Sequence, residues 1–236
     1  MLLHGFAGTG AAWEAVIAFL DAERYRALTP DLPGHGSAAH VRPVDFASCV
    51  DHVAALAPER FELCGYSMGG RVALHVALAH PDRVTRLVLV ATTAGIEDET
   101  QRAERRASDL ALAAEVERGT IADFAAQWTA QPLFASDPPH LAAGWRADLM
   151  RNDPRSLAEV LRGIGSGSMT PLWDRLGQLS MPVLVVVGER DVRYRAIAGQ
   201  MVAALPRARL VVVPGAGHGL PREAPAALAE SLQASG

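Results

Sequence analysis

The sequence contains no lysine, and all 22 of its basic residues are arginine. Finding arginine rather than lysine at a given place therefore carries no information, and only the position of an arginine in the chain does. The formal net charge is −4 and the pI is about 6.1. This balance gives no electrostatic reason to expect a nucleic acid or an anionic membrane surface as a partner.

Cysteine is scarce, and long apolar runs are missing. Cys49 and Cys64 cannot form a disulfide framework, and no Cys/His spacing is typical of a zinc site, so we expect neither a metal nor a cofactor. Apolar stretches such as Val183–Val187 are far too short to cross a bilayer. The first residues lack the basic and apolar regions of a signal peptide. These absences predict a cytoplasmic protein.

Half of the 236 residues are hydrophobic, which is enough for one sizeable core. Short apolar runs are typical of strands buried on both faces of a parallel sheet. Such runs occur at Met1–Leu3, Phe61–Cys64, Val84–Ala91, Val183–Val187 and Leu210–Val213, with a weaker candidate at Tyr25–Thr29. Helical patterns lie between them, at Ala11–Glu23, Phe46–Ala57, Met68–Ala79, Tyr194–Leu205 and Pro225–Gln233. The alternation predicts a single α/β domain over residues 1–236 with a mainly parallel, doubly wound sheet.

The alternation stops between Thr92 and Leu179. This stretch is polar and rich in arginine, has helical spacing at Gln101–Glu117 and Ile121–Thr129, and contains no good strand. Because ligands of open α/β sheets bind at the carboxyl ends of the strands, we expect residues 95–175 to form a helical cap over those ends. An ordinary helical excursion without a role is the alternative.

A G-x-S-x-G motif lies between a predicted strand and a predicted helix, in the run Phe61-Glu-Leu-Cys-Gly-Tyr-Ser-Met-Gly-Gly70. In a nucleophile elbow the serine sits on a strained turn from strand to helix, with small residues two positions before and after it. Gly65 and Gly69 supply these small residues around Ser67. The bare motif is weak evidence, but its position favours an elbow over a plain strand–turn–helix.

A serine hydroxyl needs a histidine as its base, and the histidine needs an acid to fix its tautomer. Behind such an elbow the order along the chain is serine, acid, histidine. His218 is the histidine near the C-terminus, and it follows a predicted strand. Asp191 follows the strand Val183–Val187 and is the predicted acid, with Glu189 as the alternative.

An oxyanion hole needs two backbone N–H groups aimed at one oxygen. Met68, directly after the predicted nucleophile, supplies one of them. Leu3-His-Gly-Phe6 follows the first strand and matches the loop that supplies the second, from Phe6. In the turn Asp31-Leu-Pro-Gly-His-Gly-Ser37, we expect His35 to brace the turn rather than to catalyse.

With these motifs placed, the chain resembles the α/β-hydrolase superfamily over nearly its whole length. It resembles one family more closely, the 2-succinyl-6-hydroxy-2,4-cyclohexadiene-1-carboxylate synthases of menaquinone biosynthesis. Several shared motifs are superfamily-wide: His4-Gly-Phe-Ala-Gly-Thr-Gly10, Asp31-Leu-Pro-Gly-His-Gly36, the elbow and Gly188-Glu-Arg-Asp191. More specific are Arg71 and two cap motifs, Gln101-Arg-Ala-Glu-Arg105 and Trp128 with Gln131-Pro-Leu-Phe-Ala-Ser136.

That resemblance implies a lyase that eliminates pyruvate from 2-succinyl-5-enolpyruvyl-6-hydroxy-3-cyclohexene-1-carboxylate. The triad would abstract a ring proton next to the succinyl ketone, and the enolate oxygen would enter the oxyanion hole. By the same resemblance, Arg71, Arg105 and Arg151 match the arginines that bind the substrate's carboxylates. Tyr66 and Trp128 match pocket residues. A serine hydrolase acting on esters or carbon–carbon bonds, or a non-catalytic ligand-binding protein, is the alternative.

The position of Arg71 has a physical meaning of its own. It lies one helical turn after Ser67, on the same face of a helix that is normally buried. An unpaired guanidinium there costs on the order of several kcal/mol, which favours a pocket that receives anions. The alternative to ligand binding for Arg71 is a structural ion pair with the cap. For Arg105 and Arg151 the alternative is that they are solvated residues on the cap surface. By the resemblance, the first strand looks like the third of the family's sheet, so we expect either that the sequence starts late or that this sheet is shorter and lacks the usual leading antiparallel strands.

Overall fold

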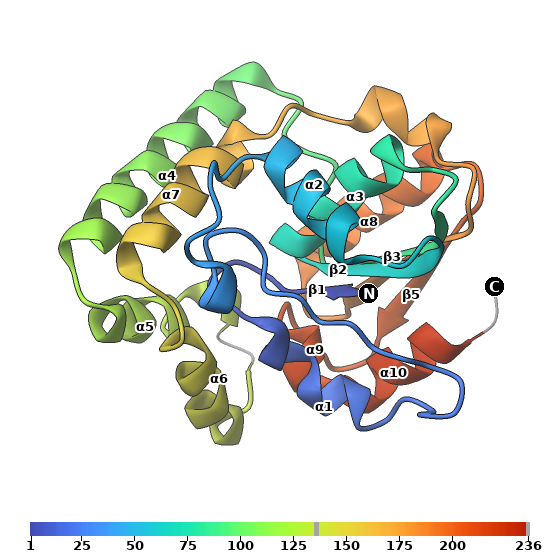
Figure 1. Ribbon diagram of the computed structural model, residues 1–236, viewed down its shortest axis with the longest axis horizontal. Coiled ribbons are helices and arrows are strands. Elements are labelled where there is room, and N and C mark those ends of the chain that lie inside the picture. Colours follow the sequence, from blue (N-terminus) through green and yellow to red (C-terminus); the bar gives the residue numbers. More distant parts are fainter. Residues whose placement is uncertain (135–136, 235–236) are drawn as a thin grey trace.

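The centre of the computed structural model is a sheet of five parallel strands, hydrogen-bonded in the same order as they follow in the chain (Figure 1). The strands are β1 (Leu2–Leu3), β2 (Phe61–Tyr66), β3 (Val84–Val90), β4 (Val183–Gly188) and β5 (Ala208–Val213). All four pairings are parallel, and the register places Leu2 opposite Cys64 and Val90 opposite Val186. The prediction of a mainly parallel sheet is therefore confirmed, but the edge strand β5 is not buried on both faces, since Leu210 and Val212 are 39% and 37% exposed.

Helices cover both faces of this sheet (Figure 1). One face carries α2 (Phe46–Leu56), α3 (Met68–Ala79) and α8 (Val192–Ala204), and the other carries α1 (Glu14–Ile17), α9 (Leu220–Glu223) and α10 (Pro225–Gln233). Short 3-10 helices occur at Gly10–Trp13, Gly36–Ala38, Pro132–Phe134, Pro139–Leu141, Ser166–Ser168 and Trp173–Gln178. The structure describes residues 1–134 and 137–234.

Two local predictions are wrong. The expected helix Ala11–Glu23 is a 3-10 turn followed by an α-helix that ends at Ile17. Tyr25–Thr29 is not a strand, although it runs beside β1, where the Leu2 amide donates to the Leu28 carbonyl at 2.8 Å. Because β1 has only two residues, it offers too short an edge for a ladder to form along this segment.

Four helices, α4 (Glu99–Arg118), α5 (Ile121–Thr129), α6 (Ala142–Leu149) and α7 (Pro154–Ile164), lie in the connection from β3 to β4. Asp98, Thr120 and Asp153 begin three of them as N-caps, each accepting from the amide three residues on. Among the described residues of 92–179 there is no strand. The four helices lie together at one side of the sheet (left in Figure 1), and we call residues 95–175 the cap.

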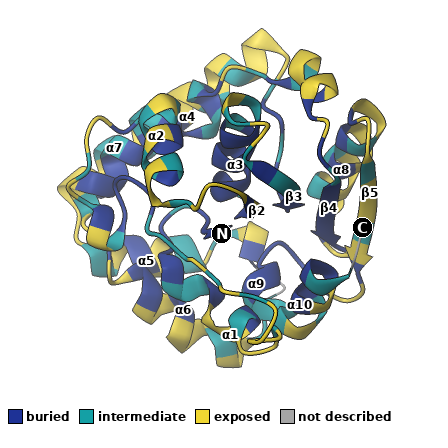
Figure 2. Cartoon of the chain, turned by 45° about the vertical axis from the view of Figure 1, so that its right-hand side comes forward, coloured by how far each residue is buried: buried dark blue, intermediate teal, exposed yellow. Residues whose placement is uncertain are grey.

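Among the described residues, the buried apolar side chains form three clusters, one on each face of the sheet and one inside the cap. Figure 2 colours the buried residues of the chain dark blue. The cap cluster joins Phe124, Trp145 and Leu157 to Ala7, which lies in the loop after β1. The cap therefore has its own core, and that core packs directly on the loop predicted to supply part of the oxyanion hole.

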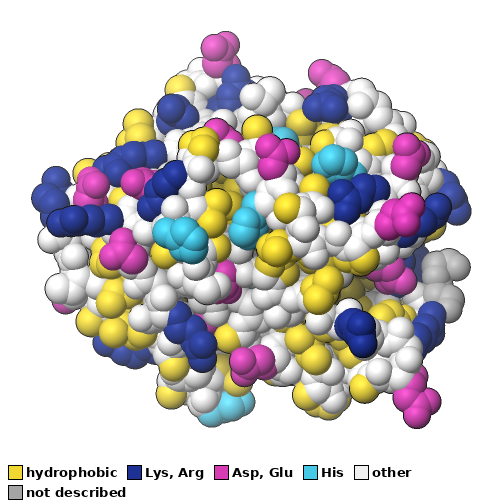
Figure 3. Space-filling view, in the orientation of Figure 1, with side chains coloured by type: hydrophobic (Ala, Val, Ile, Leu, Met, Phe, Trp, Pro, Cys, Tyr) yellow, Lys and Arg dark blue, Asp and Glu magenta, His cyan; other side chains and the backbone are white. Residues whose placement is uncertain are grey.

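The surface mixes charges of both signs. On the face shown in Figure 3, arginine and acidic side chains alternate over the region of α4 and α7. Of the helices described, none is long and apolar enough to span a bilayer. Within the same residues, no group of three or more His, Cys, Asp or Glu side chains is placed to hold a metal ion.

Candidate active site

Ser67 lies on a sharp turn between β2 and α3. Its φ of 52° and ψ of −110° are sparsely populated for a residue with a side chain, and such strain is typical of a nucleophile elbow. A Cβ on Gly65 would lie 2.3 Å from the Gly69 carbonyl oxygen, and one on Gly69 would lie 2.4 Å from the Leu3 carbonyl oxygen. Both glycines are therefore required, because backbone atoms occupy the space of any larger residue.

The three predicted triad side chains are brought together from the ends of three strands. The Ser67 Oγ is 3.2 Å from His218 Nε2, and His218 Nδ1 is 2.6 Å from Asp191 Oδ2. The other oxygen of Asp191 accepts from the Tyr194 amide at 3.3 Å, as the N-cap of α8. Glu189, the alternative acid, instead accepts from the Gly215 amide at 2.9 Å.

The acid and the histidine of this triad are shielded from water. Asp191 and His218 are 7% and 2% exposed, so water competes little for the bond between them. With its Nδ1–H donated to Asp191, the imidazole presents Nε2 as an acceptor for the Ser67 hydroxyl. This arrangement is able to withdraw a proton from the serine or, through it, from a bound substrate. The two cysteines offer no competing nucleophile, because burial raises the pKa of both thiols to about 12.

Two buried histidines hold the loop that carries Phe6. His4 donates from Nδ1 to the Gly5 carbonyl at 2.8 Å and accepts the Leu32 amide at Nε2 at 2.9 Å. The Nε2 of His35 accepts the Ala7 amide at 3.2 Å. These roles require neutral rings, and burial lowers the pKa of both, that of His35 to about 3. His35 thus braces a turn, as expected from the sequence.

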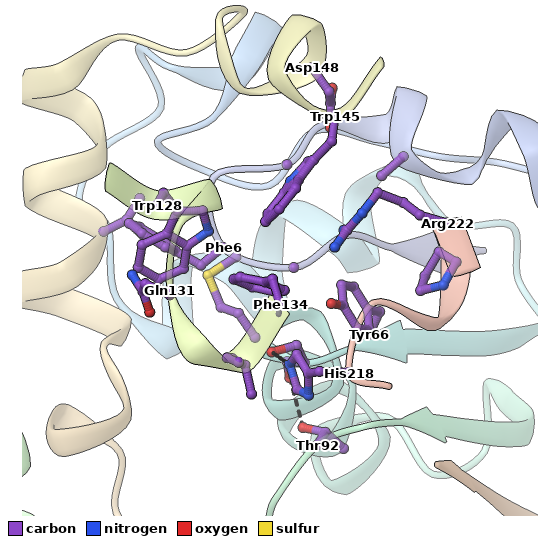
Figure 4. Close-up of a pocket in the computed structure, with 18 of the residues that line it drawn as sticks. Phe6, Tyr66, Thr92, Trp128, Gln131, Phe134, Trp145, Asp148, His218 and Arg222 are labelled. Atoms are coloured by element: carbon purple, nitrogen blue, oxygen red, sulfur yellow. Dashed lines mark hydrogen bonds between the residues drawn. The ribbon is translucent and has the colours of Figure 1, made fainter. Parts of the chain in front are cut away.

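Phe6 and Met68, the predicted oxyanion-hole residues, both line the cavity beside Ser67. Met68 is the first residue of α3, where a helix leaves backbone N–H groups without a partner of its own. The Thr92 hydroxyl donates to the Ser67 carbonyl at 2.7 Å and ties the elbow to the end of β3 (Figure 4). The oxyanion hole itself stays a prediction.

The cavity has a volume of about 700 Å³ and lies between the cap and the carboxyl ends of the strands. Its walls include Ser67 and His218 from the sheet side, and Trp128, Phe134 and Trp145 from the cap (Figure 4). Such a position, at the carboxyl edge of a parallel sheet, is where ligands of α/β folds bind. Aromatic side chains form one part of this wall, and charged side chains, among them Arg71, Arg105 and Arg151, line it as well.

Arg71 is the most buried of the arginines that line the cavity. It is only 7% exposed, and its Nη1 donates to the Ile164 carbonyl at 2.6 Å. Burial lowers its pKa to about 10. Among the described residues no carboxylate forms a salt bridge with it, so the alternative of an ion pair with the cap is not what the structure contains. A desolvated cation of this kind is a ready partner for an anionic ligand.

The other two predicted arginines differ from Arg71 and from each other. The Nε of Arg105 pairs with Asp109 at 2.7 Å, and its side chain is 41% exposed. Asp109 is buried and also accepts from the Gly167 amide at 2.9 Å, so this carboxylate joins α4 to the 3-10 helix Ser166–Ser168 that follows α7. Arg151 is 61% exposed at the rim, with Asp148 4.0 Å from its Nε. All three arginines line the same cavity.

The predicted pocket residues also lie in its wall. Tyr66 is 6% exposed, with its ring centroid 5.6 Å from that of His218, and burial raises the pKa of its phenol. Trp128 packs edge-on against Phe6 at 5.0 Å. In the motif that begins at Gln131, residues Gln131, Leu133 and Phe134 line the cavity. The last two residues of that motif, 135 and 136, lie outside the described residues.

Sequence reasoning missed three residues of the site. The Arg222 guanidinium lies 4.0 Å from the ring centroid of Trp145, and both line the cavity (Figure 4). Tyr194 packs against His218, with ring centroids 4.6 Å apart. Arg222 and Tyr194 follow His218 and Asp191 by four and three residues, and this closeness in the chain was the available signal. Nothing in the local pattern distinguishes Trp145 from an ordinary core residue.

A serine on a nucleophile elbow, an acid and a histidine at the carboxyl ends of β2, β4 and β5 are the arrangement that defines the α/β-hydrolase class. The model of the alpha/beta hydrolase family matches residues 1–231, and the chain belongs to that family.

Three known proteins are similar to the chain over most of its length. A Bacillus subtilis protein provisionally named 2-succinyl-6-hydroxy-2,4-cyclohexadiene-1-carboxylate synthase is 35% identical, over 94% of this chain and 84% of its own. The pimeloyl-[acyl-carrier protein] methyl ester esterase of Nitrosomonas europaea is 33% identical, over 92% and 87%. The structure of MenH from S. aureus has a TM-score of 0.92 at 29% identity, covering 98% of this chain and 90% of that one.

Proposed function

We propose that this chain is a lyase of menaquinone biosynthesis. It eliminates pyruvate from 2-succinyl-5-enolpyruvyl-6-hydroxy-3-cyclohexene-1-carboxylate to give 2-succinyl-6-hydroxy-2,4-cyclohexadiene-1-carboxylate. The observation that carries the proposal is Arg71, a buried guanidinium that lines the cavity of Ser67 and has no carboxylate paired with it in the described chain. The names of the Bacillus relative and of the S. aureus structure support the same reading.

The proposed reaction begins with proton abstraction. His218, held by Asp191, draws the proton from the Ser67 hydroxyl while the serine oxygen takes the ring proton next to the succinyl ketone. The electron pair moves onto the ketone oxygen, and the amides of Phe6 and Met68 stabilise the resulting enolate. When the enolate collapses, the bond from the ring to the enolpyruvyl oxygen breaks. The leaving enolate then takes a proton and becomes pyruvate, and no covalent bond to the enzyme forms.

Each of the three arginines has a different role in binding a carboxylated substrate. Arg71 contacts a carboxylate deep in the cavity, where exclusion of water makes a charge-assisted contact strong. Arg105 has its Nε engaged by Asp109, which fixes the side chain and leaves its terminal nitrogens for the ligand. Arg151 stands at the exposed rim and attracts the substrate from solution. Tyr66 and Trp128 supply the wall around the ring.

The second candidate is a serine hydrolase acting on esters. The 33% identity to the Nitrosomonas esterase favours it, because one triad supports many reactions. In that reaction Ser67 attacks carbon and forms an acyl-enzyme. A ligand-binding protein without catalysis is a third candidate, and the contacts of His218 with both Ser67 and Asp191 count against it.

The experiment is to incubate the protein with the enolpyruvyl substrate and to measure pyruvate with a coupled dehydrogenase. We expect rapid release that Ser67→Ala abolishes, with no change in the mass of the intact protein during turnover. Neutral esters should be poor substrates. An acyl adduct on Ser67, or efficient cleavage of neutral esters without pyruvate release, would reject the lyase and favour the hydrolase.

A further inference from the structure

Two consecutive residues of α9, Arg222 and Glu223, contact different parts of the site. Oε2 of Glu223 accepts the Gly217 amide at 2.7 Å, and Oε1 accepts the Gly219 amide at 2.8 Å. One planar carboxylate therefore spans the two amides that flank His218. Because glycine has the least restricted backbone of any residue, these bonds limit how far the loop can turn the imidazole.

Arg222 extends to the cap. Its Nη2 donates to Asp137 Oδ2 at 2.6 Å, and its guanidinium lies over the ring of Trp145. The side chains of Arg222 and Asp137 are only 15% and 10% exposed. A bonded pair with so little exposure exchanges slowly with water, and breaking it strands a buried charge. Figure 4 shows Arg222 between Trp145 of the cap and Tyr66 of β2.

The two contacts are electrostatically linked. Burial, followed by the neighbouring carboxylate of Asp137, raises the pKa of Glu223. Asp137 of the cap therefore lies close to the carboxylate that holds the His218 loop, and the Arg222 cation neutralises the repulsion between them. The same cap segment carries Phe134, whose ring centroid is 6.0 Å from that of His218.

We propose that Arg222 and Glu223 form a positioning pair: Glu223 fixes the loop that carries His218, and Arg222 ties that loop to the cap through Asp137. The inference rests on the triad of the proposed function and does not depend on the identity of the substrate. When the cap segment with Asp137 is bound to Arg222, the loop holds His218 within hydrogen-bonding distance of Ser67. When this cap segment is displaced, His218 is no longer held there.

The test measures how fast Ser67 is labelled by a fluorophosphonate, which requires an activated serine but no particular substrate. We expect Glu223→Gln to slow labelling about ten- to a hundred-fold, because misplacing a reacting group by about 1 Å costs that much. Glu223→Asp keeps the charge but is too short to reach both amides, so it should show a similar loss. Both should shift the downfield proton resonance of His218 Nδ1–H.

The matched control is Glu189→Gln. Glu189 also accepts a loop amide, that of Gly215, three residues before His218. If this variant slows labelling as much as Glu223→Gln does, the role is general support of the loop and the proposal is wrong. The proposal would also be overturned if the fluorophosphonate labelled Ser67 no faster in the wild type than in His218→Ala. In that case the wild type would have no activated triad to position.

A double-mutant cycle tests the tie to the cap. If Arg222 acts through Asp137, the labelling loss in Arg222→Met combined with Asp137→Asn should be no larger than the loss in the worse single variant. Losses that multiply would show independent roles and would overturn the tie. The readouts separate the two proposals: absent pyruvate release with Glu223-dependent labelling rejects the lyase alone, and pyruvate release with Glu223-independent labelling rejects the positioning pair alone.

Discussion

Replacing Arg71 by methionine separates a ligand-binding charge from a structural one. Burial lowers the pKa of Arg71 from its ordinary value to about 10, so the charged form is disfavoured in the folded state by about 3 kcal/mol. Methionine removes that cost and fills a similar volume, but it leaves the Ile164 carbonyl without its donor, which costs about 1–3 kcal/mol. We therefore expect the melting temperature of Arg71→Met to equal that of the wild type or to exceed it by a few degrees.

Activity should change in the opposite direction. A hydrogen bond to a charged group contributes about 1.5–3 kcal/mol, so losing the contact of Arg71 with a substrate carboxylate should lower kcat/KM for pyruvate release about ten- to a hundred-fold. Cleavage of neutral esters, which lack that carboxylate, should not become worse. The assay pairs steady-state kinetics with thermal unfolding on the same preparations.

Arg83 provides the matched control. Its Nη2 donates to the carbonyls of Ala54, Ala57 and Pro58, and it does not line the cavity. Arg83→Met should lower the melting temperature and leave kcat/KM unchanged. If Arg71→Met instead melts well below the wild type while keeping kcat/KM within about twofold, Arg71 is a structural residue and the reasoning fails.

Two further predictions follow from the site. Asp191→Asn should fold, because the amide oxygen still accepts the Tyr194 amide and caps α8. Its kcat should fall roughly 10³–10⁴-fold, because asparagine holds the wrong tautomer of His218. Near-normal turnover would reject Asp191 as the acid. Acid should weaken the fold through His35, whose pKa burial and then the neighbouring His4 lower to about 3. The unfolded ring takes up a proton below its ordinary pKa near 6.5 and the folded ring does not, so this stability is complete above about pH 6.5 and declines toward pH 3, by about 2 kcal/mol at pH 5. His35→Gln keeps an acceptor for the Ala7 amide without titrating, so urea unfolding should show a shallower loss between pH 6.5 and 5; an equal slope would contradict this.

Much of the site could be predicted because each of its parts is marked by a pattern that is local in the chain. The strand, turn and helix around Ser67 lie within one run of residues, and the required glycines mark it. Asp191 and His218 each follow an apolar strand, and parallel strands bring their carboxyl ends to one edge of the sheet. Periodicity was a poorer guide where local propensity is weak: the helix expected at Ala11–Glu23 ends at Ile17, and Tyr25–Thr29 is no strand.

Apolar runs and motifs were sufficient to predict the α/β class, the order of the strands along the chain and the residues that meet at the strand ends. The role of each charge, in contrast, depends on contacts that form only in the folded protein. Arg71, Arg105 and Arg222 look alike in the sequence, yet one is buried without a carboxylate, one is paired within its own helix, and one joins the His218 loop to the cap. The interaction energy of a charge depends on its distance to other charges and on its exposure to water. Here the groups that set these distances and this exposure lie up to about a hundred residues away in the chain.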